Sequence, residues 1–289
     1  YFPGRKVILR QTRRFGEAIH HFSQIIRRGI LDSIEKDYDS LKKDGYVKRY
    51  LNFAEIPIGE LPGTWYLLGR VNTTVNELRA CAKDAGLYYG DNRGNKSFDT
   101  KQWRAIKSWT RISKGKSIKK HDAEIMMRYI REIKDHSYRR TSFWIELPDT
   151  HEYDFDGLCD WCGLNLNDDA ATKPWWDILQ RNFTATQTEY FIRLLKRYGQ
   201  DSLDNEPQII IDTIHSVKGG EANNVLLYSK ANYPSSFVNK KSADDKSDEK
   251  RVYYTGATRA RDTLHILSSN YRYNYPIGED YLIYLQEKK

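Results

Sequence analysis

The chain has 289 residues, which is enough for one large domain or two ordinary domains with a sizeable core. Its 47 Lys and Arg residues outnumber its 39 Asp and Glu residues, so the formal net charge is +8. This surplus favours an anionic partner, although ordinary soluble proteins also carry such a charge. No apolar run reaches the length of a membrane span, and the first residues lack a signal-peptide core. We therefore expect a soluble, cytoplasmic protein.

The three cysteines, Cys81, Cys159 and Cys162, are too few for a disulfide framework in a chain of this size. Cys159 and Cys162 have the spacing of zinc ligands, with His151 nearby, but a structural zinc site needs four ligands. Two interpretations remain open, a structural zinc site or a pair of reduced thiols. Our assignment of site residues contains no metal ligand.

The amino-terminal part shows two strand-and-helix patterns. Residues 6–9 form a short apolar run that ends in a basic turn, and residues 15–30 carry apolar side chains at helical spacing. The apolar run at residues 65–69 predicts a second strand. A helical pattern follows at residues 74–85, and a short strand pattern at residues 87–89.

Polar and helical patterns fill two other stretches. Residues 31–62 hold a basic stretch and a loop marked by proline and glycine. The helix signals further along are a capping box at Asp99 and Gln102, an apolar face at residues 122–133, and a second cap at Thr186 and Glu189. We therefore predict a mostly α-helical insertion at residues 91–206.

Strand patterns return at residues 208–212, 224–228 and 263–267. Continuous apolar strands separated by helices are typical of a parallel sheet covered on both faces. Residues 234–250 are too polar to pack, which predicts a mobile loop. The sequence thus predicts an α/β fold in which residues 1–90 and 207–289 form one domain around the insertion.

The first motif with chemical content is Thr-Ile-His-Ser-Val-Lys-Gly-Gly-Glu at residues 213–221. Its glycines let the backbone approach a ligand closely, and Glu221 can accept hydrogen bonds from ribose hydroxyls. Thr213, His215 and Ser216 are neutral donors suited to nucleic-acid phosphates. The alternative is that these side chains only cap a strand end while the glycines turn the chain.

The second motif is Val-Tyr-Tyr-Thr-Gly-Ala-Thr-Arg-Ala-Arg at residues 252–261. Helical spacing would bury its tyrosines on one face, so that Arg259 projects from another. A permanently charged guanidinium in this position can stabilise the charge that builds on a γ-phosphate during phosphoryl transfer. The alternative is an ordinary salt bridge between Arg259 and Asp262.

The third motif is the basic cluster at residues 9–14, which follows the predicted strand at residues 6–9. Ligands of α/β proteins bind where parallel strands end. Arg14 can therefore act as a second phosphate sensor, and Arg13 can stack on a base. The alternative is that these arginines are simply solvated.

The combined motifs resemble the second motor domain of UvrD/Rep-type superfamily 1 helicases, over nearly the whole chain. Four segments carry the resemblance, and they occur in the order of the family's motifs. They are Leu-x-Gln-x-x-Arg at residues 9–14 (motif IV), the strand motif at residues 65–72, residues 213–221 (motif V) and residues 252–260 (motif VI).

The resemblance implies a role for each site residue. Arg14 and Arg259 would contact the γ-phosphate as catalytic residues, while Glu221 would contact the ribose. The remaining assignments are Arg13 and Gly220 at the nucleotide, and Arg70, Asn72, Thr213, His215 and Ser216 along a track for single-stranded DNA.

The resemblance also implies a fold and an activity. The fold would be a RecA-like parallel sheet covered by helices, with the insertion as an accessory subdomain. The chain would be the carboxyl-terminal part of an ATP-dependent DNA helicase or translocase acting in repair or replication. Its partners would be single-stranded DNA, a duplex junction and the amino-terminal motor domain of the same protein.

Three features depart from the family pattern. Arg13 replaces the usual aromatic residue before the motif IV arginine, Gly220 replaces a leucine in motif V, and the insertion is short. In addition, the sequence has no phosphate-binding Gly-x-x-x-x-Gly-Lys-Thr/Ser loop and no Asp-Glu pair after an apolar strand. We expect a preceding domain to bind most of the ATP and Mg²⁺, so that this chain alone does not hydrolyse ATP.

Two other classes of function remain open. One is a nucleic-acid-binding module without catalytic activity, which would keep the basic track and tolerate loss of Arg259. The other is the motor part of a helicase–nuclease, which would need an acidic metal-binding cluster elsewhere.

Overall fold

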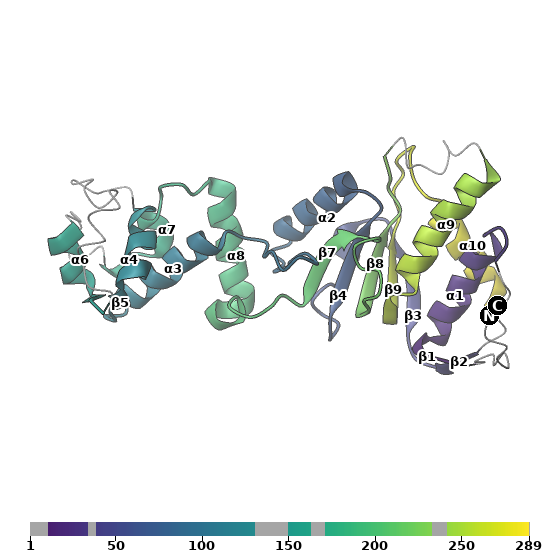
Figure 1. The fold of residues 1–289 in the computed structure, drawn as a ribbon, viewed down its shortest axis with the longest axis horizontal. Helices are drawn as coiled ribbons and strands as arrows, with labels where there is room; N and C mark the ends of the chain where they lie inside the picture. Colours follow the sequence, from purple (N-terminus) through teal and green to yellow (C-terminus); the bar gives the residue numbers. More distant parts are fainter. Residues whose placement is uncertain (1–10, 34–38, 131–149, 163–170, 233–241, 289) are drawn as a thin grey trace, which may run out of the picture. The chain divides into compact units, whose positions relative to one another are not determined.

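The structure is a computed structural model, which describes residues 11–33, 39–130, 150–162, 171–232 and 242–288. The chain divides into two compact units, which we describe separately (Figure 1). The sheet unit comprises residues 1–95 and 206–289, and the helical unit comprises residues 96–205. Among the described residues, no helix has the length and apolar character needed to cross a membrane.

A five-stranded sheet forms the centre of the sheet unit, and all of its strand pairs are parallel. In spatial order the strands are β3 (Tyr46–Tyr50), β9 (Ala260–Leu267), β8 (Ala222–Tyr228), β4 (Trp65–Gly69) and β7 (Ile209–Thr213). Because every strand runs in the same direction, all strand starts lie at one edge of the sheet and all strand ends at the other.

Helices cover both faces of this sheet (Figure 1). One face packs against α1 (Glu17–Arg28), α9 (Ala243–Ala257) and α10 (Ile277–Glu287), and the other against α2 (Asn72–Asp84).

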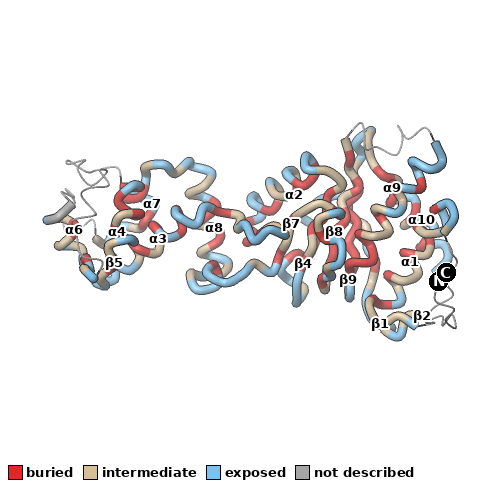
Figure 2. The backbone as a smooth tube through the Cα atoms, in the orientation of Figure 1, coloured by how far each residue is buried: buried red, intermediate tan, exposed pale blue. Residues whose placement is uncertain are grey.

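Neighbouring residues of one strand point to opposite faces of the sheet. In β4, Leu68 belongs to the core under α1 and α9, while Leu67 belongs to the core under α2. Figure 2 shows the buried positions gathered along the central strands. A parallel sheet flanked by helices on both faces is the RecA-like arrangement that the sequence predicts.

A second, two-stranded sheet pairs β1 (Gln11–Gly16) with β2 (Asp39–Lys42) in parallel. The strand predicted at residues 6–9 lies outside the described residues. The basic turn predicted directly after it is wrong, because these residues form β1. Strands β2 and β3 also lie in a stretch where the sequence predicts only a basic segment and a loop.

Two local predictions are wrong. Residues 87–89 do not form a strand; they lead into Gly90, which makes a single parallel bridge with Ile210. Residues 243–250 are not a loop but the first half of α9. This polar helix packs because Ser247 and Glu249, buried on its inner side, both have polar partners: the Ser247 hydroxyl accepts a hydrogen bond from the backbone N–H of Leu31 at 3.0 Å.

The helical unit is mostly α-helical, as its sequence predicts. Its elements are α3 (Thr100–Ile112), α4 (Lys120–Met127), α6 (Phe155–Cys162), α7 (Trp175–Ile178), α8 (Ala185–Ser202) and an antiparallel pair of β5 (Ile118–Lys119) and β6 (Glu152–Tyr153). Aromatic rings fill its core; those of Phe98 and Trp103 lie 5.9 Å apart between centroids at the start of α3.

The two predicted helix caps differ in outcome. Asp99 caps α3 by accepting hydrogen bonds from the backbone N–H groups of Lys101 and Gln102. The Gln102 side chain donates instead to the carbonyl of Asn182, so the predicted box is only half formed. The cap predicted at residues 186 and 189 is wrong, because the cap of α8 is the box formed by Thr184 and Gln187, two residues earlier.

Candidate functional site

Two of the predicted phosphate and ribose residues lie where strands of the main sheet begin. Glu221 directly precedes β8, and Arg259 directly precedes β9. Arg14 reaches the same point from β1. The carbonyl oxygen of Gly220 accepts hydrogen bonds from Arg14 Nη2 at 3.3 Å and from Arg259 Nη1 at 3.0 Å. The structure therefore brings Arg14, Gly220, Glu221 and Arg259 together in what we call the Gly220 cluster.

Arg259 lies in the turn between α9 and β9, so its predicted place within a helix is wrong. It is only 9% exposed, and its Nε donates to the carbonyl of Thr255 at 3.1 Å. Burial and the neighbouring Arg14 lower the pKa of Arg259, but a guanidinium remains charged at neutral pH. The alternative salt bridge with Asp262 is not formed, since Asp262 pairs with Lys42.

Arg14 has a hydrogen-bond donor that lacks an acceptor. Its Nε lies 3.5 Å from Glu221 Oε2, close enough for an ion pair. The same buried Nε makes no hydrogen bond to any described residue. A buried donor without an acceptor is energetically unfavourable, so Arg14 would be stabilised if a shift of its side chain brought this Nε to an oxygen acceptor.

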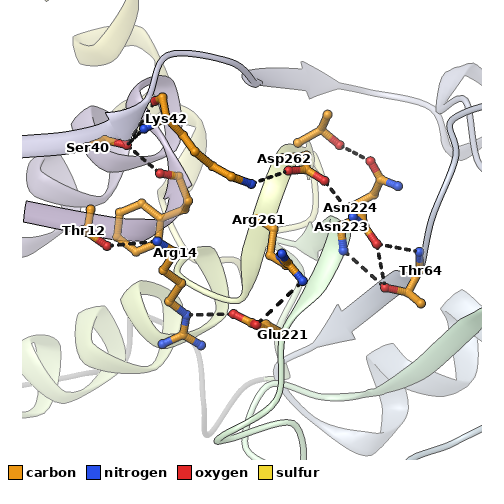
Figure 3. A network of polar contacts seen from close by, with 12 residues as sticks. Thr12, Arg14, Ser40, Lys42, Thr64, Glu221, Asn223, Asn224, Arg261 and Asp262 are labelled. Atoms are coloured by element: carbon orange, nitrogen blue, oxygen red, sulfur yellow. Dashed lines mark hydrogen bonds and ion pairs between the residues drawn. The ribbon is translucent and has the colours of Figure 1, made fainter.

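The sequence reasoning missed a further cation, Arg261. Its Nη1 lies 3.9 Å from Glu221 Oε1, and Figure 3 shows Arg14 and Arg261 approaching Glu221 from opposite sides. Arg261 is the second residue of β9 and follows Arg259 by two positions, a spacing that places side chains on the same side of an extended chain. This spacing was the available signal.

A polar network fixes the adjoining strand starts (Figure 3). Asp262 accepts hydrogen bonds from Lys42 Nζ at 3.0 Å and from Asn223 Nδ2 at 2.7 Å. Although burial acts to raise the pKa of Asp262, these hydrogen bonds hold it below its usual range. Asn223 also accepts a hydrogen bond from the backbone N–H of Thr64 at 3.1 Å, so the residue before β4 is tied to the first residues of β8 and β9.

The two glycines of the segment at residues 213–221 are required for different structural reasons. Gly219 has a φ of 95°, a backbone conformation that side chains other than glycine rarely adopt. Gly220 lies against Tyr66, whose hydroxyl oxygen would be 2.6 Å from any added Cβ. Close packing against Tyr66 therefore accounts for the glycine at position 220.

The predicted nucleic-acid residues lie at the opposite edge of the sheet, where β4 and β7 end. We call them the strand-end set: Arg70, Asn72, Thr213, His215 and Ser216. Thr213 and Ser216 form a closed turn, in which the Ser216 hydroxyl donates to the Thr213 carbonyl at 2.8 Å and Thr213 Oγ1 accepts from the Ser216 backbone N–H at 3.2 Å. His215 and Asn72 are exposed.

Arg70 is held by a buried carboxylate that the sequence reasoning did not identify. Its Nε and Nη2 donate to the two carboxylate oxygens of Glu249 at 2.8 and 2.9 Å. The hydrogen bonds that Arg70 donates to Glu249 raise the pKa of Arg70. The available signal was the position of Glu249 four residues before the buried Tyr253, on the inner face of α9.

His215 carries no charge at neutral pH. Burial, followed by the charge of nearby Arg70, lowers its pKa below the usual value of 6.5. It is therefore a neutral donor and acceptor beside a permanent cation, as the sequence interpretation requires.

Residues 214–221 join the two edges. They leave the end of β7 and reach the start of β8, and on the way Ile214 and Val217 are buried in the core of one sheet face. Arg13 lies in β1, but its side chain is outside the described residues.

The predicted metal-site alternative falls in α6. Cys159 is partly buried, and the side chain of Cys162 lies outside the described residues. Among the described residues, no group of three or more His, Cys, Asp or Glu side chains is placed to hold a metal ion.

Comparison with protein-family models identifies part of the chain. Residues 175–271 match the family model of the UvrD-like helicase C-terminal domain. A search of curated proteins finds no match to the chain. The matched segment includes the turn at residues 213–221, Glu249 and Arg259. Over residues 175–271 the chain is therefore similar to the C-terminal domain of UvrD-like helicases.

Proposed function

We propose that the chain supplies the carboxyl-terminal motor part of an ATP-dependent superfamily 1 DNA helicase or translocase in the cytoplasm. The observation that carries this proposal is the Gly220 cluster. Two guanidiniums from distant parts of the sequence share one carbonyl oxygen beside a carboxylate, in a chain that is similar over residues 175–271 to the C-terminal domain of UvrD-like helicases.

The Gly220 cluster suits a nucleoside triphosphate. Arg14 and Arg259 would contact the γ-phosphate, Glu221 would accept hydrogen bonds from the ribose, and Gly220 and Arg13 would lie beside the nucleotide. The unsatisfied Nε of Arg14 supports this, because a phosphate oxygen would give it an acceptor. A preceding motor domain would provide the phosphate cradle and the Mg²⁺ ligands, and Mg²⁺ would neutralise charge on the phosphates.

The strand-end set suits a single-stranded DNA backbone. Arg70, whose charge is paired with Glu249, holds its guanidinium in a fixed direction. Thr213 and His215 would supply neutral donors at the end of β7, and Ser216, whose hydroxyl donates to the Thr213 carbonyl, would shape the turn. Asn72, exposed at the start of α2, would lie on the same track. Contacts of this kind read the backbone rather than the bases, so binding would tolerate many sequences and weaken with salt.

The connection between the two edges suits a motor. Residues 214–221 include His215 and Ser216 of the strand-end set at one edge of the sheet. They also include Gly220 and Glu221 of the Gly220 cluster at the other edge. Closure of the two motor domains on ATP would move Gly220, and the buried Ile214 and Val217 would transmit that movement to Thr213 and His215. Each cycle would advance the grip on single-stranded DNA, in the 3′ to 5′ direction as in related helicases.

The helical unit would be the accessory subdomain, and its predicted extent of residues 91–206 remains part of this proposal. A hollow of about 620 Å³ in this unit is lined by more cations than carboxylates. The cations are Lys96, Lys101, Arg104, Lys107 and Arg128, and the carboxylates are Glu124 and Asp204. We propose this face for contact with the duplex junction, because phosphates favour surplus cations.

The test is Arg259→Ala in the intact protein with its preceding motor domain. Loss of an arginine finger should lower the rate of ATP hydrolysis about 1,000-fold or more, while affinity for single-stranded DNA stays within about twofold. Arg28→Ala, an exposed arginine on α1, is the matched control.

Unchanged hydrolysis in the Arg259 variant would refute the motor proposal and favour a DNA-binding module without catalytic activity. Hydrolysis of DNA by the intact protein would instead favour the helicase–nuclease alternative. Magnesium-dependent ATP turnover by the purified 289 residues alone would contradict the assignment of the other half of the site to a preceding domain.

A further inference from the structure

A tight loop follows α2 at residues 91–95. Asp91 holds it closed: its Oδ1 accepts hydrogen bonds from the backbone N–H groups of Arg93 and Asn95, each at 2.9 Å. The Asp91 N–H also donates to the Asn95 carbonyl at 3.0 Å, and Gly94 has a φ of 83°. Although burial acts to raise the pKa of Asp91, these hydrogen bonds keep it low, so the carboxylate stays charged and the loop keeps one shape.

The Asp91 loop is attached to the turn that carries the strand-end set. The Asn92 backbone N–H donates to Asp212 Oδ2 at 3.2 Å, and its side-chain Nδ2 donates to the Ser216 carbonyl at 2.8 Å. Both partners lie at the end of β7, which is an outer strand of the sheet. The loop therefore lies beside the end of the outer strand β7, next to the proposed DNA track.

Arg93 stands at the tip of this loop and is exposed. Among the described residues, its guanidinium has no ion pair or hydrogen bond. Nearby arginines differ, since Arg70 is neutralised by Glu249, and Arg79 Nη2 lies 3.9 Å from Asp91. Arg93 is thus an unneutralised cation on a rigid support, one residue from a direct contact with the Ser216 turn.

We propose that the Asp91 loop is an additional part of the nucleic-acid surface, in which Arg93 binds a phosphate of single-stranded nucleic acid beyond the edge of β7. This rests on the proposed function, because it extends the same track. A backbone that passes the end of β4 and then the end of β7 reaches the loop next. Binding of a phosphate would require little ordering of the loop, since the hydrogen bonds of Asp91 and Asn92 already fix its backbone.

The test uses the 289-residue chain and a fluorescently labelled oligothymidylate, with anisotropy titrations at several salt concentrations. Loss of one phosphate contact to a single strand should reduce the slope of log K against log salt by about 0.7, which is roughly fivefold in affinity at 0.1 M salt. We expect this for Arg93→Ala, with most of the affinity kept in Arg93→Lys. The matched control Arg28→Ala should stay within about twofold of the wild type, because it removes a charge distant from the loop.

The outcomes separate this inference from the proposed function. If Arg93→Ala matches Arg28→Ala in affinity and slope while His215→Ala binds more weakly, the loop assignment fails and the track remains. If the unmodified chain shows no salt-dependent binding, the track and the loop assignment both fail. An unchanged melting temperature for Arg93→Ala is expected, because the side chain has no partner to lose.

Discussion

The strand-start and strand-end edges of the main sheet differ in how far carboxylates compensate the charges of their arginines. At the strand starts, the guanidiniums of Arg14 and Arg261 both face the single carboxylate of Glu221, and buried Arg259 adds a third positive charge. At the strand ends, the guanidinium of Arg70 is paired with the buried carboxylate of Glu249. The first edge therefore keeps a surplus of positive charge, while the second has a cation whose charge is already compensated.

This difference distinguishes two uses of arginine. A surplus of guanidiniums suits a ligand with several negative charges that arrives and leaves, such as a triphosphate. A guanidinium held by two hydrogen bonds to a buried carboxylate is fixed in direction, so it suits a surface that must keep its shape. The edges should therefore respond differently to the removal of a charge.

The largest expected effect is on stability at the strand-end edge. Arg70→Ala leaves the Glu249 side chain, which is 4% exposed, without its cation. Breaking a buried ion pair by removing one partner costs about 3–5 kcal/mol in the free energy of unfolding. Urea denaturation of the 289-residue chain measures this loss.

The matched change at the other edge is Glu221→Ala. The Glu221 side chain is 44% exposed, so its ion pairs contribute less than about 1 kcal/mol to stability. Equal losses for the two variants would show that the edges do not differ as we describe. A double replacement of Arg70 and Glu249 by Met and Leu should restore most of the lost stability.

An intermediate effect is expected for Gly220→Ala. The added Cβ would lie 2.6 Å from the Tyr66 hydroxyl, and such overpacking costs about 1–3 kcal/mol in the free energy of unfolding. The same substitution in a Tyr66→Phe background should cost less, because the contacting oxygen is gone. Thermal unfolding of the four proteins tests this, and an equal cost in both backgrounds would exclude the steric explanation.

The smallest effect is a pH dependence confined to the strand-end edge. His215 has a lowered pKa, so it is neutral at pH 7 and gains its proton only as the pH falls below 6.5. Its positive charge should then strengthen binding of an oligothymidylate by up to roughly fivefold, the contribution of one phosphate contact. Anisotropy titrations between about pH 7.5 and pH 5 measure the change.

The control for this pH dependence is His215→Gln, which cannot be protonated in that range. The affinity of this variant for the oligothymidylate should lack the increase that protonation of His215 produces in the unmodified protein. Any change with pH that remains would come from other titratable groups. Binding by the unmodified protein that weakens as the pH falls would have the wrong sign for the proposed role of His215.

The sequence predicted the buried strands well because their residues are apolar on both faces. β4, β7, β8 and β9 were all found from such runs. β3 was missed because Lys48 and Arg49 interrupt its apolar pattern, whereas β7, the other outer strand, begins with three isoleucines.

Long-range partners explain the other errors. Residues 243–250 look like a loop because they are polar, yet Ser247 bonds to Leu31 and Glu249 to Arg70, residues far away in the sequence. No local pattern reveals such pairs. The local motifs did lead to Arg14, Glu221 and Arg259, whereas the pairing of Glu249 with Arg70 became visible only once α9 was placed against the sheet.

The helix α9 connects the two edges in one further way. It carries Glu249, and eight residues later it ends at Ala257, directly before the turn that contains Arg259. At 1.5 Å per residue these points are about 12 Å apart along its axis, and a helix of this length behaves as a stiff rod. A ligand that moves Arg259 outward would therefore also shift Glu249, the carboxylate that orients Arg70. In this way α9 would mechanically connect the strand-start edge of the sheet to the strand-end edge.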